Sequence, residues 1–141
     1  MKKVYFDASV IIAGLLSPSG GSSALITLAQ KNSIIGITSQ TVVEEILSHR
    51  HKIRKIPEEI IEYIHENNLI IRNEILLKDI QAISDLMIDV DDAHVFVGAM
   101  HTGADYLVSL DKKHILAPSV KATFSHLHIC SPKELLAILS K

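Results

Sequence analysis

Short apolar runs alternate along the chain with longer stretches in which apolar residues recur at helical spacing. The short runs predict strands, and the periodic stretches between them predict helices. Strands that alternate with helices in this way are typical of a parallel sheet covered by helices on both faces, so the predicted fold class is α/β. The expected strands are Lys3–Phe6, Ser33–Ser39, Leu69–Arg72, Asp105–Ser109 and His126–Cys130.

Capping residues mark the ends of several predicted helices. Ser39 is a suitable N-cap, and Ser131 precedes Pro132 at the first position of a closing helix. Pro57 can start a helix in the same way, and Gly103 is suited to follow a helix end. Besides the helices that follow Pro57 and Ser131, helices are expected over Ala8–Leu16, Ser22–Asn32 (with Ser22 or Ser23 as N-cap), Ser39–Lys52, Leu77–Ile88 and from the aspartates at 91 and 92 to His101.

The size and composition of the chain fit one folded unit. Its 141 residues favour a single domain spanning 1–141, and a hydrophobic content of 48% allows a well-buried core. Aromatic residues make up only 4%, so the core must be mostly aliphatic. The net charge of −2 argues against a strongly basic nucleic-acid binder but leaves a local basic surface open.

The single cysteine and the N-terminal stretch bear on location. Cys130 alone cannot form an internal disulfide framework, and it suits a reducing cytosol. Asp7 interrupts the apolar stretch near the N-terminus, which also lacks a clear cleavage site, so no signal peptide is expected. No segment reaches the ~20 apolar residues needed to span a bilayer. We therefore expect a cytoplasmic protein with no membrane association.

Four acidic residues fall where an open α/β sheet binds its ligands, beyond the carboxyl ends of the strands. Asp7 follows the first expected strand, and Asp111 follows the fourth. Asp92 lies in the first turn of the helix that leads into the fourth strand, and Glu45 lies in the helix after the second. The topology permits these four carboxylates to meet at one edge of the sheet.

Clustered carboxylates repel one another, and their pKa values rise unless a cation offsets the charge. Mg²⁺ or Mn²⁺ prefers oxygen ligands of this kind. A divalent cation can activate a bound water and stabilise charge on a phosphate. The sequence offers no compelling Cys–His nucleophile, so the acids fit metal-assisted phosphodiester hydrolysis better than acyl transfer.

Three sequence blocks together resemble the PIN domain, a fold found in many ribonucleases and in the VapC-type toxins of toxin–antitoxin pairs. They are "VYFDASV", "TSQTVVEEIL" and "DDAHVFVGAMHTGADYLVSLD", of which the third is the most specific. The resemblance extends from residue 3 to about residue 135. It implies a three-layer α/β/α PIN-like fold with a central parallel sheet of about five strands.

The resemblance also implies a function and a site. It implies a metal-dependent endoribonuclease that uses Mg²⁺ or Mn²⁺, is a toxin inhibited by an antitoxin protein, and forms a homodimer. The residues that match the family motifs are Asp7, Glu45, Asp92 and Asp111 as metal ligands and catalytic acids, with supporting hydroxyls at Ser9 and Ser109. Position within each block favours Glu45 over Glu44 and Asp92 over Asp91. The family usually has threonine where this chain has Ser109, a change that keeps the oxygen.

Each of these acids also has a purely structural interpretation. Asp7 could cap the helix that follows it, and Asp111 could form a turn. Glu45 could be an exposed helix charge. Among the aspartates before the next helix, Asp91 is the expected N-cap, whereas Asp89 is expected to be a solvated loop charge or a charge at the end of the preceding helix.

The histidines and one basic run carry weaker signals. His94 could face the site, whereas the histidines at 49, 51, 126 and 128 are expected at the surface and not at a zinc site. The basic run over His49–Lys55 is either a solvated helix end, where cations favour the helix dipole, or a contact surface for RNA phosphates. The candidate RNA-contacting residues are Arg50, Lys52, Arg54 and Lys55.

Two other functions remain compatible with such a fold. A phosphotransfer protein could use Asp7 as a nucleophile, but haloacid-dehalogenase-type phosphatases have a second aspartate at the position that Ser9 occupies here. A PIN-like domain without catalysis could bind nucleic acid or protein. The presence of all four acids counts against a degenerate site of that kind.

Overall fold

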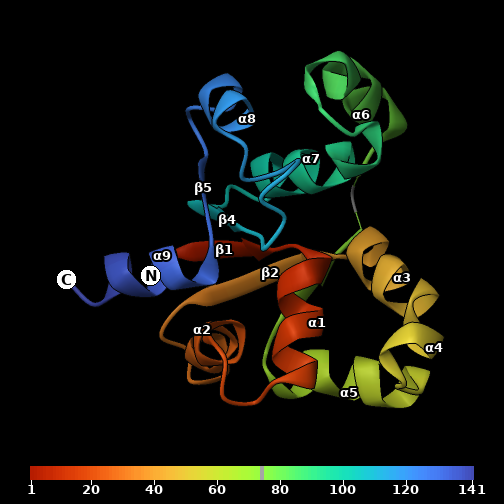
Figure 1. Ribbon diagram of the computed structural model, residues 1–141, viewed down its shortest axis with the longest axis vertical. Coiled ribbons are helices and arrows are strands. Elements are labelled where there is room, and N and C mark those ends of the chain that lie inside the picture. The colour runs from red at the N-terminus through yellow and green to blue at the C-terminus, as the bar shows by residue number, and fades with distance from the viewer. Residues whose placement is uncertain (74) are drawn as a thin grey trace.

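Five parallel strands form a sheet at the centre of the protein, in the order β3-β2-β1-β4-β5 (Figure 1). The computed structural model describes residues 1–73 and 75–141. β1 is the middle strand, with Val4 opposite Gly36 on one side and Tyr106 on the other. The predicted α/β fold, with helices on both faces of a parallel sheet, is confirmed. The strands are β1 (Lys3–Phe6), β2 (Ile35–Ser39), β3 (Ile70–Arg72), β4 (Tyr106–Val108) and β5 (His128–Cys130).

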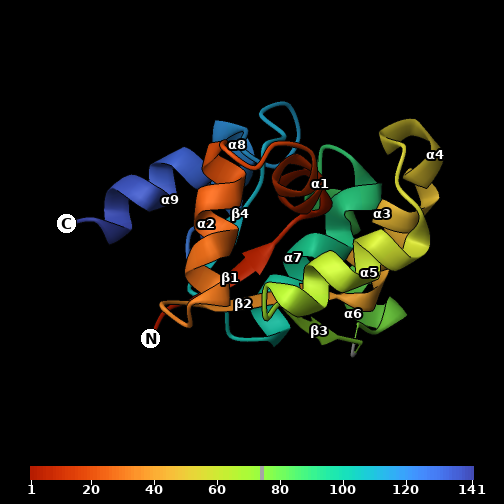
Figure 2. The same cartoon turned by 90° about the horizontal axis from the view of Figure 1, so that it is seen from below.

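Two layers of helices cover the sheet, which gives the predicted three-layer α/β/α arrangement. In Figure 1, α6, α7 and α8 lie above the sheet and α1, α2 and α5 lie below it, while Figure 2 shows α2 and α5 in front of the strands. Helix α3 packs against α1 and α5, and α9 packs against α2. The helices are α1 (Ala8–Leu16), α2 (Gly21–Gln30), α3 (Gln40–Ser48), α4 (Arg50–Ile53), α5 (Pro57–Glu66), α6 (Leu77–Ile83), α7 (Ala93–His101), α8 (Pro118–Thr123) and α9 (Pro132–Leu139), with 3₁₀ turns at Ser84–Leu86 and Val90–Asp92.

Helix α7 packs directly on the middle of the sheet, where it contacts β1, β2 and β4. All its residues from Ala93 to Ala99 are buried, which explains why this helix is almost continuously apolar. Gly98 allows the close approach, because a Cβ atom there would lie 2.6 Å from Cζ of the fully buried Tyr5. The middle of α7 therefore lies close against β1.

Several predicted helix ends are wrong, for local reasons. Helix α2 begins one residue before Ser22, with Gly20 in extended conformation at the N-cap position, so neither Ser22 nor Ser23 is the cap. The helix expected over Ser39–Lys52 breaks at His49. There the Glu45 carbonyl accepts hydrogen bonds from the Ser48 hydroxyl and His49 Nδ1, which compete with the helical bonds.

Two further differences concern the second half of the chain. The helix expected over Leu77–Ile88 ends at Ile83 and gives way to a 3₁₀ turn. The short helix α8 was not predicted, although Pro118 occupies its first turn and is a recognisable start signal. The predicted caps at Ser39 and Ser131, Pro57 at the first position of α5, and Gly103 with φ of 68° after α7 are confirmed.

Among the residues that the structure describes, no single helix is long and apolar enough to cross a membrane. Helices α1 and α2 together pass that test by length and composition, but they are bent by 98° at the break between them.

Candidate active site at the carboxyl edge of the sheet

Asp7 lies at the carboxyl end of β1, at the centre of the edge where ligands of open sheets bind. It occupies the N-cap position of α1, but its side chain makes no capping hydrogen bond. Instead Asp7 Oδ2 accepts hydrogen bonds from the hydroxyls of Ser109, at 2.6 Å, and Ser9, at 2.9 Å. The interpretation of Asp7 as a side-chain cap is therefore wrong.

The Asp7 carboxylate is only 5% exposed. Burial raises its pKa above the ordinary value, and the negative charge of Glu45 acts in the same direction. The hydroxyls of Ser109 and Ser9 oppose this rise because they donate hydrogen bonds to the charged form. The two hydrogen bonds therefore offset only part of the cost of burying a charged Asp7 carboxylate.

Two serine hydroxyls join the end of β1 to the loop after β4. Ser9 Oγ accepts a hydrogen bond from the Leu110 backbone N–H at 3.1 Å, and Ser109 Oγ accepts one from the Asp111 N–H at 3.0 Å. Ser109 is fully buried, and the two hydroxyl oxygens are 3.4 Å apart. Each serine hydroxyl therefore links the Asp7 carboxylate to a backbone N–H of the loop after β4, because it donates to the first and accepts from the second.

If the acids of this edge hydrolyse nucleic acid, as the sequence resemblance implies, replacing Ser109 by alanine should reduce the rate without abolishing it. The Asp7 carboxylate would lose its shortest hydrogen bond, its pKa would rise further, and the Asp111 backbone N–H would lose its acceptor. We expect a loss of about tenfold, the lower end of the range seen when groups that orient metal ligands are removed. Cleavage of a fluorescently labelled nucleic acid would measure both variants, and Ser109→Thr, which keeps the hydroxyl, should retain most of the wild-type rate.

Asp92 immediately precedes α7, and its Oδ2 atom is buried without a hydrogen-bond partner. Partial burial raises the pKa of Asp92 to about 6, and the negative charges of Asp89, Asp7 and Asp111 raise it as well. The charge of Asp92 therefore interacts with the charges of the two strand-end acids. A buried carboxylate oxygen without a donor is costly unless a cation or another ligand occupies the space beside it.

The neighbours of Asp92 differ from the sequence-based expectation. Asp91 is exposed and is not the cap, whereas Asp89 Oδ1 accepts a hydrogen bond from the Asp91 backbone N–H at 3.0 Å. Asp89 is therefore the N-cap of the 3₁₀ turn that leads into α7, and it is partly buried, not a fully solvated charge. An aspartate two residues before another backbone N–H commonly closes such a turn.

Asp111 follows β4 and forms a turn there, which is one of the two roles considered for it. Its Oδ1 accepts hydrogen bonds from the backbone N–H groups of Lys113 and His114, both at 3.1 Å, so it shapes the turn. Its Oδ2 lies 3.2 Å from Nδ1 of His114. The same carboxylate raises the pKa of Asp92, so it also contributes to the negative potential of the site.

Glu45 reaches the site from α3 and contacts a buried histidine. Glu45 Oε1 lies 3.3 Å from Nε2 of His94, and the Glu45 side chain is 40% exposed. His94 is 8% exposed, and its Nδ1 is buried without a hydrogen-bond partner. Glu44 is exposed, and Glu45 is the glutamate whose charge acts on Asp7. Within the described residues, the four predicted acids thus form one electrostatically connected group.

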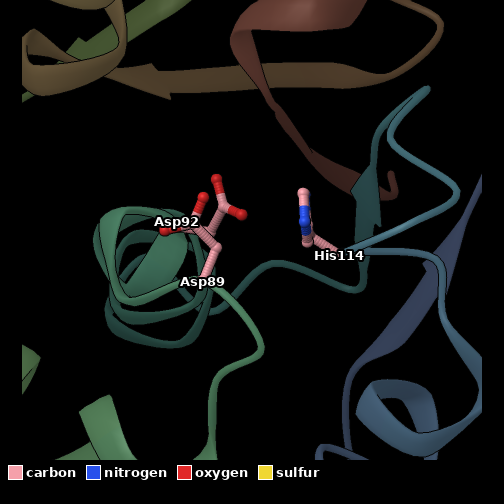
Figure 3. A group of neighbouring side chains, drawn as sticks. All are labelled: Asp89, Asp92 and His114. Carbon is pink, nitrogen blue, oxygen red and sulfur yellow. The ribbon is translucent and has the colours of Figure 1, made fainter.

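Two more residues, Asp89 and His114, lie beside Asp92, and neither was among the site residues expected from the sequence. Asp89, Asp92 and His114 each offer a metal-ligating atom, and these atoms all lie within 4.8 Å of one another. Figure 3 shows the two aspartates at the start of α7 and the His114 ring on the loop after β4. The available signal was the position of His114 three residues after Asp111, in "DKKH".

The donor atoms at this edge fit a divalent cation. They are mostly carboxylate oxygens, which hard cations prefer, and the Asp92 oxygen without a partner needs a positive neighbour. Burial raises the pKa values of Asp7 and Asp92, and neighbouring carboxylates raise them further, so a cation beside these acids would favour their charged forms.

The sequence profile of the PIN domain matches residues 3–113, which include all the acids of the site. The chain belongs to the PIN domain family. PIN domains are generally nucleases and typically use divalent metal ions, so membership supports a hydrolase of nucleic acids. The chain matches none of the curated proteins with which it was compared.

The basic run lies on the loop and short helix that follow α3. Helix α4 is on the side of the sheet where the strands end at their carboxyl termini, as Figures 1 and 2 show. Lys52 and Arg54 are exposed, Arg50 donates a hydrogen bond to the Leu47 carbonyl, and Lys55 pairs with Glu59 at 3.6 Å.

The predicted surface histidines are exposed: His49, His51, His126 and His128.

Proposed function

We propose that this PIN domain is an endoribonuclease that hydrolyses RNA phosphodiester bonds with the help of Mg²⁺ or Mn²⁺. The observation that carries the proposal is the buried, unpartnered Asp92 Oδ2 among the charges of Asp7 and Asp111. Asp7, Asp92 and Asp111 would hold the cation, with Glu45 assisting directly or through a water. When bound, such a cation lowers the pKa of water and offsets charge on the phosphate.

The protein residues themselves hold and orient these groups. Ser9 and Ser109 keep the Asp7 carboxylate turned toward the β4 loop, and the turn made by Asp111 places that acid opposite the start of α7. His94 holds the Glu45 carboxylate from the adjacent helix. Because these acids are already held in place, little entropy would be lost when the phosphodiester and the attacking water are brought into line.

RNA is the proposed substrate, partly because a basic surface flanks the acidic edge. An acidic edge repels phosphates, so a neighbouring cationic surface is needed to retain the strand. Arg50, Lys52, Arg54 and Lys55 on and after α4 would supply it. Contacts of this kind add affinity through released counterions and therefore weaken with salt.

Replacing Lys52 and Arg54 together by alanine is expected to weaken RNA binding about tenfold at low salt and much less at high salt. Each phosphate contact removed should lower the slope of log affinity against log salt by about one. Fluorescence anisotropy with a labelled RNA in the presence of Ca²⁺ would measure both quantities. Lys133→Ala on α9 is the matched control and should change neither.

Cleavage of a panel of structured RNAs tests the function. We expect cleavage with Mn²⁺ or Mg²⁺, loss of cleavage in excess EDTA, and recovery when metal is restored. Matched DNA strands should be cut far more slowly. RNA binding without cleavage under any metal condition would instead favour the non-catalytic PIN domain, and cleavage unaffected by EDTA would contradict the metal-dependent mechanism.

We further propose that the protein is a cytoplasmic toxin that is inhibited by an antitoxin protein and that forms a homodimer. Large apolar side chains are exposed along 76–90, and exposed apolar surface of this kind often marks a protein contact. They are Leu76, Leu77, Leu86, Ile88 and Val90. Light scattering should give twice the chain mass for the wild type, and a monomer at all concentrations would contradict the dimer.

Arrested growth on expression, relieved by the product of a neighbouring gene, would support the toxin role.

A further inference from the structure

His114 lies in the acidic site without being one of the acids that define it. One of its ring nitrogens lies within 4.8 Å of carboxylate oxygens of Asp89 and Asp92. Its Nδ1 is 3.2 Å from Asp111 Oδ2, which fixes the ring beside the site. When Nδ1 donates this hydrogen bond, Nε2 keeps the lone pair that a metal ligand needs, as in carboxylate–histidine–metal arrangements.

Asp89 also has free capacity for a ligand. Its Oδ1 caps the 3₁₀ turn through the Asp91 backbone N–H, and that bond does not involve Oδ2. The turn fixes the Asp89 side chain close to Asp92, and the negative charge of Asp89 is one of the causes that raise the pKa of Asp92. Two neighbouring carboxylates and an imidazole are a common ligand set for Mn²⁺ and related ions.

A second observation shows that this cluster needs a positive partner. Asp92 Oδ2 is buried and has no hydrogen-bond donor, although His114 and Asp89 lie close by. If the three residues formed only an ion-pair cluster, a donor from His114 would be expected to satisfy this oxygen. Asp92 Oδ2 instead remains without a donor, and Figure 3 shows the Asp89 and Asp92 carboxylates side by side at the start of α7 with the His114 ring across from them.

We propose that Asp89 and His114 are metal ligands that, with Asp92, hold a divalent cation and make the centre prefer Mn²⁺ over Mg²⁺. The preference follows from the imidazole, because Mg²⁺ favours all-oxygen ligands whereas Mn²⁺ accepts nitrogen readily. The inference concerns the same metal centre as the proposed function, and it adds the identity of two ligands and the preferred ion.

Electron paramagnetic resonance of the protein with Mn²⁺ alone tests the nitrogen ligand directly. The wild type is expected to show a nitrogen coupling on bound Mn²⁺, and His114→Ala is expected to lose it. Calorimetry should show that His114→Ala weakens Mn²⁺ about tenfold and Mg²⁺ by less than about threefold. His114→Gln keeps a polar group beside Asp111 and gives the same test if the alanine variant folds poorly.

The control variants separate ligation from a positioning effect. His65→Ala removes an exposed histidine on α5 and should leave both metal affinities and the nitrogen coupling unchanged. Asp89→Asn keeps the capping oxygen and should weaken both ions, whereas Asp91→Asn should weaken neither. A wild type without nitrogen coupling, a coupling that survives in His114→Ala, or an equal loss of Mg²⁺ and Mn²⁺ affinity in that variant would overturn the proposal.

This experiment contains no RNA, so its outcome is independent of the proposed function. Nitrogen-coupled Mn²⁺ in a protein that cuts no RNA would leave the ligand assignment standing while the ribonuclease role fails. Cleavage that proceeds equally well with Mg²⁺ and is unaffected by His114→Ala would leave the ribonuclease role standing while the assignment fails.

Discussion

Replacing Asp7 by asparagine is expected to reduce RNA cleavage at least about a thousandfold while the fold survives. The carboxylate stands at the centre of the sheet edge and would share the cation with Asp92 and Asp111. Losses of this size are typical when a group that stabilises charge in the transition state is removed. Asparagine is nearly isosteric and can still accept the hydrogen bonds of Ser9 and Ser109, so the positions of both serines should be kept.

The measurement compares cleavage rates of purified variants with Mn²⁺ in excess, alongside thermal unfolding of each. Asp91→Asn is the matched control, because Asp91 is an exposed acid beside Asp92 whose side chain makes no hydrogen bond or ion pair with the described residues. It should cleave at the wild-type rate, whereas Asp92→Asn should be as inactive as Asp7→Asn. Wild-type cleavage by a well-folded Asp7→Asn protein would remove Asp7 from the mechanism.

The metal-free protein is expected to become more stable when Asp92 is replaced by asparagine, by about 1 to 2 kcal/mol at neutral pH. The pKa of Asp92 is raised to about 6 in the folded protein, from 3.8. The full shift corresponds to about 3 kcal/mol, and the partial exposure of the side chain screens it. Asparagine carries no charge to bury, and Asp92 makes no capping hydrogen bond that the change would remove.

The sign of the pH dependence follows from the direction of the shift. The folded protein binds the Asp92 proton more tightly than the unfolded chain, so its free energy of unfolding falls as the pH rises from about 4 to about 6. The raised pKa of Asp7 acts in the same direction. Denaturant unfolding in EDTA should therefore show the stabilising effect of Asp92→Asn at pH ~7.5 and its disappearance near pH ~4.

Metal should reverse the ranking of the two proteins. A cation that binds only the folded state stabilises it in proportion to the logarithm of its concentration over Kd. The wild type should therefore gain more from Mn²⁺ than Asp92→Asn does. If the variant is less stable than the wild type in EDTA at neutral pH, the charged Asp92 carboxylate does not destabilise the metal-free fold, and its unpartnered oxygen is no sign of a cation site.

The sequence predicted the sheet well because buried strands and periodic helices leave different hydrophobic patterns. The stretch over Lys3–Phe6 is fully apolar apart from Lys3, as a strand covered on both faces requires, and it forms β1 with the predicted ends. The cap at Ser39 was found because its hydroxyl has a local partner, the Val42 N–H. The break at His49 was missed, because nothing in a hydrophobic pattern reports the competition for the Glu45 carbonyl.

The site was predictable to the extent that chain position fixes it. Asp7 and Asp111 follow neighbouring parallel strands, so the topology alone brings them to one edge. The roles of Asp89 and Asp91 were reversed, because both are plausible caps and only the backbone of the 3₁₀ turn distinguishes them. His114 could not be placed, because its contact with the start of α7 depends on how a loop folds across the sheet.

The pairing of β1 with β4 determines when the site can exist during synthesis. Asp7 leaves the ribosome well before its hydrogen-bond donor Ser109, which lies 102 positions further along the chain. Contacts over such long separations form late, and domains of this kind fold largely as units. A chain that is still being made, or one that stops before β4, carries Asp7, Glu45 and Asp92 without the strand that brings them together. The assembled acidic edge therefore appears only after β4 has emerged and paired with β1, so a growing chain that has not reached this point lacks the complete set of acids.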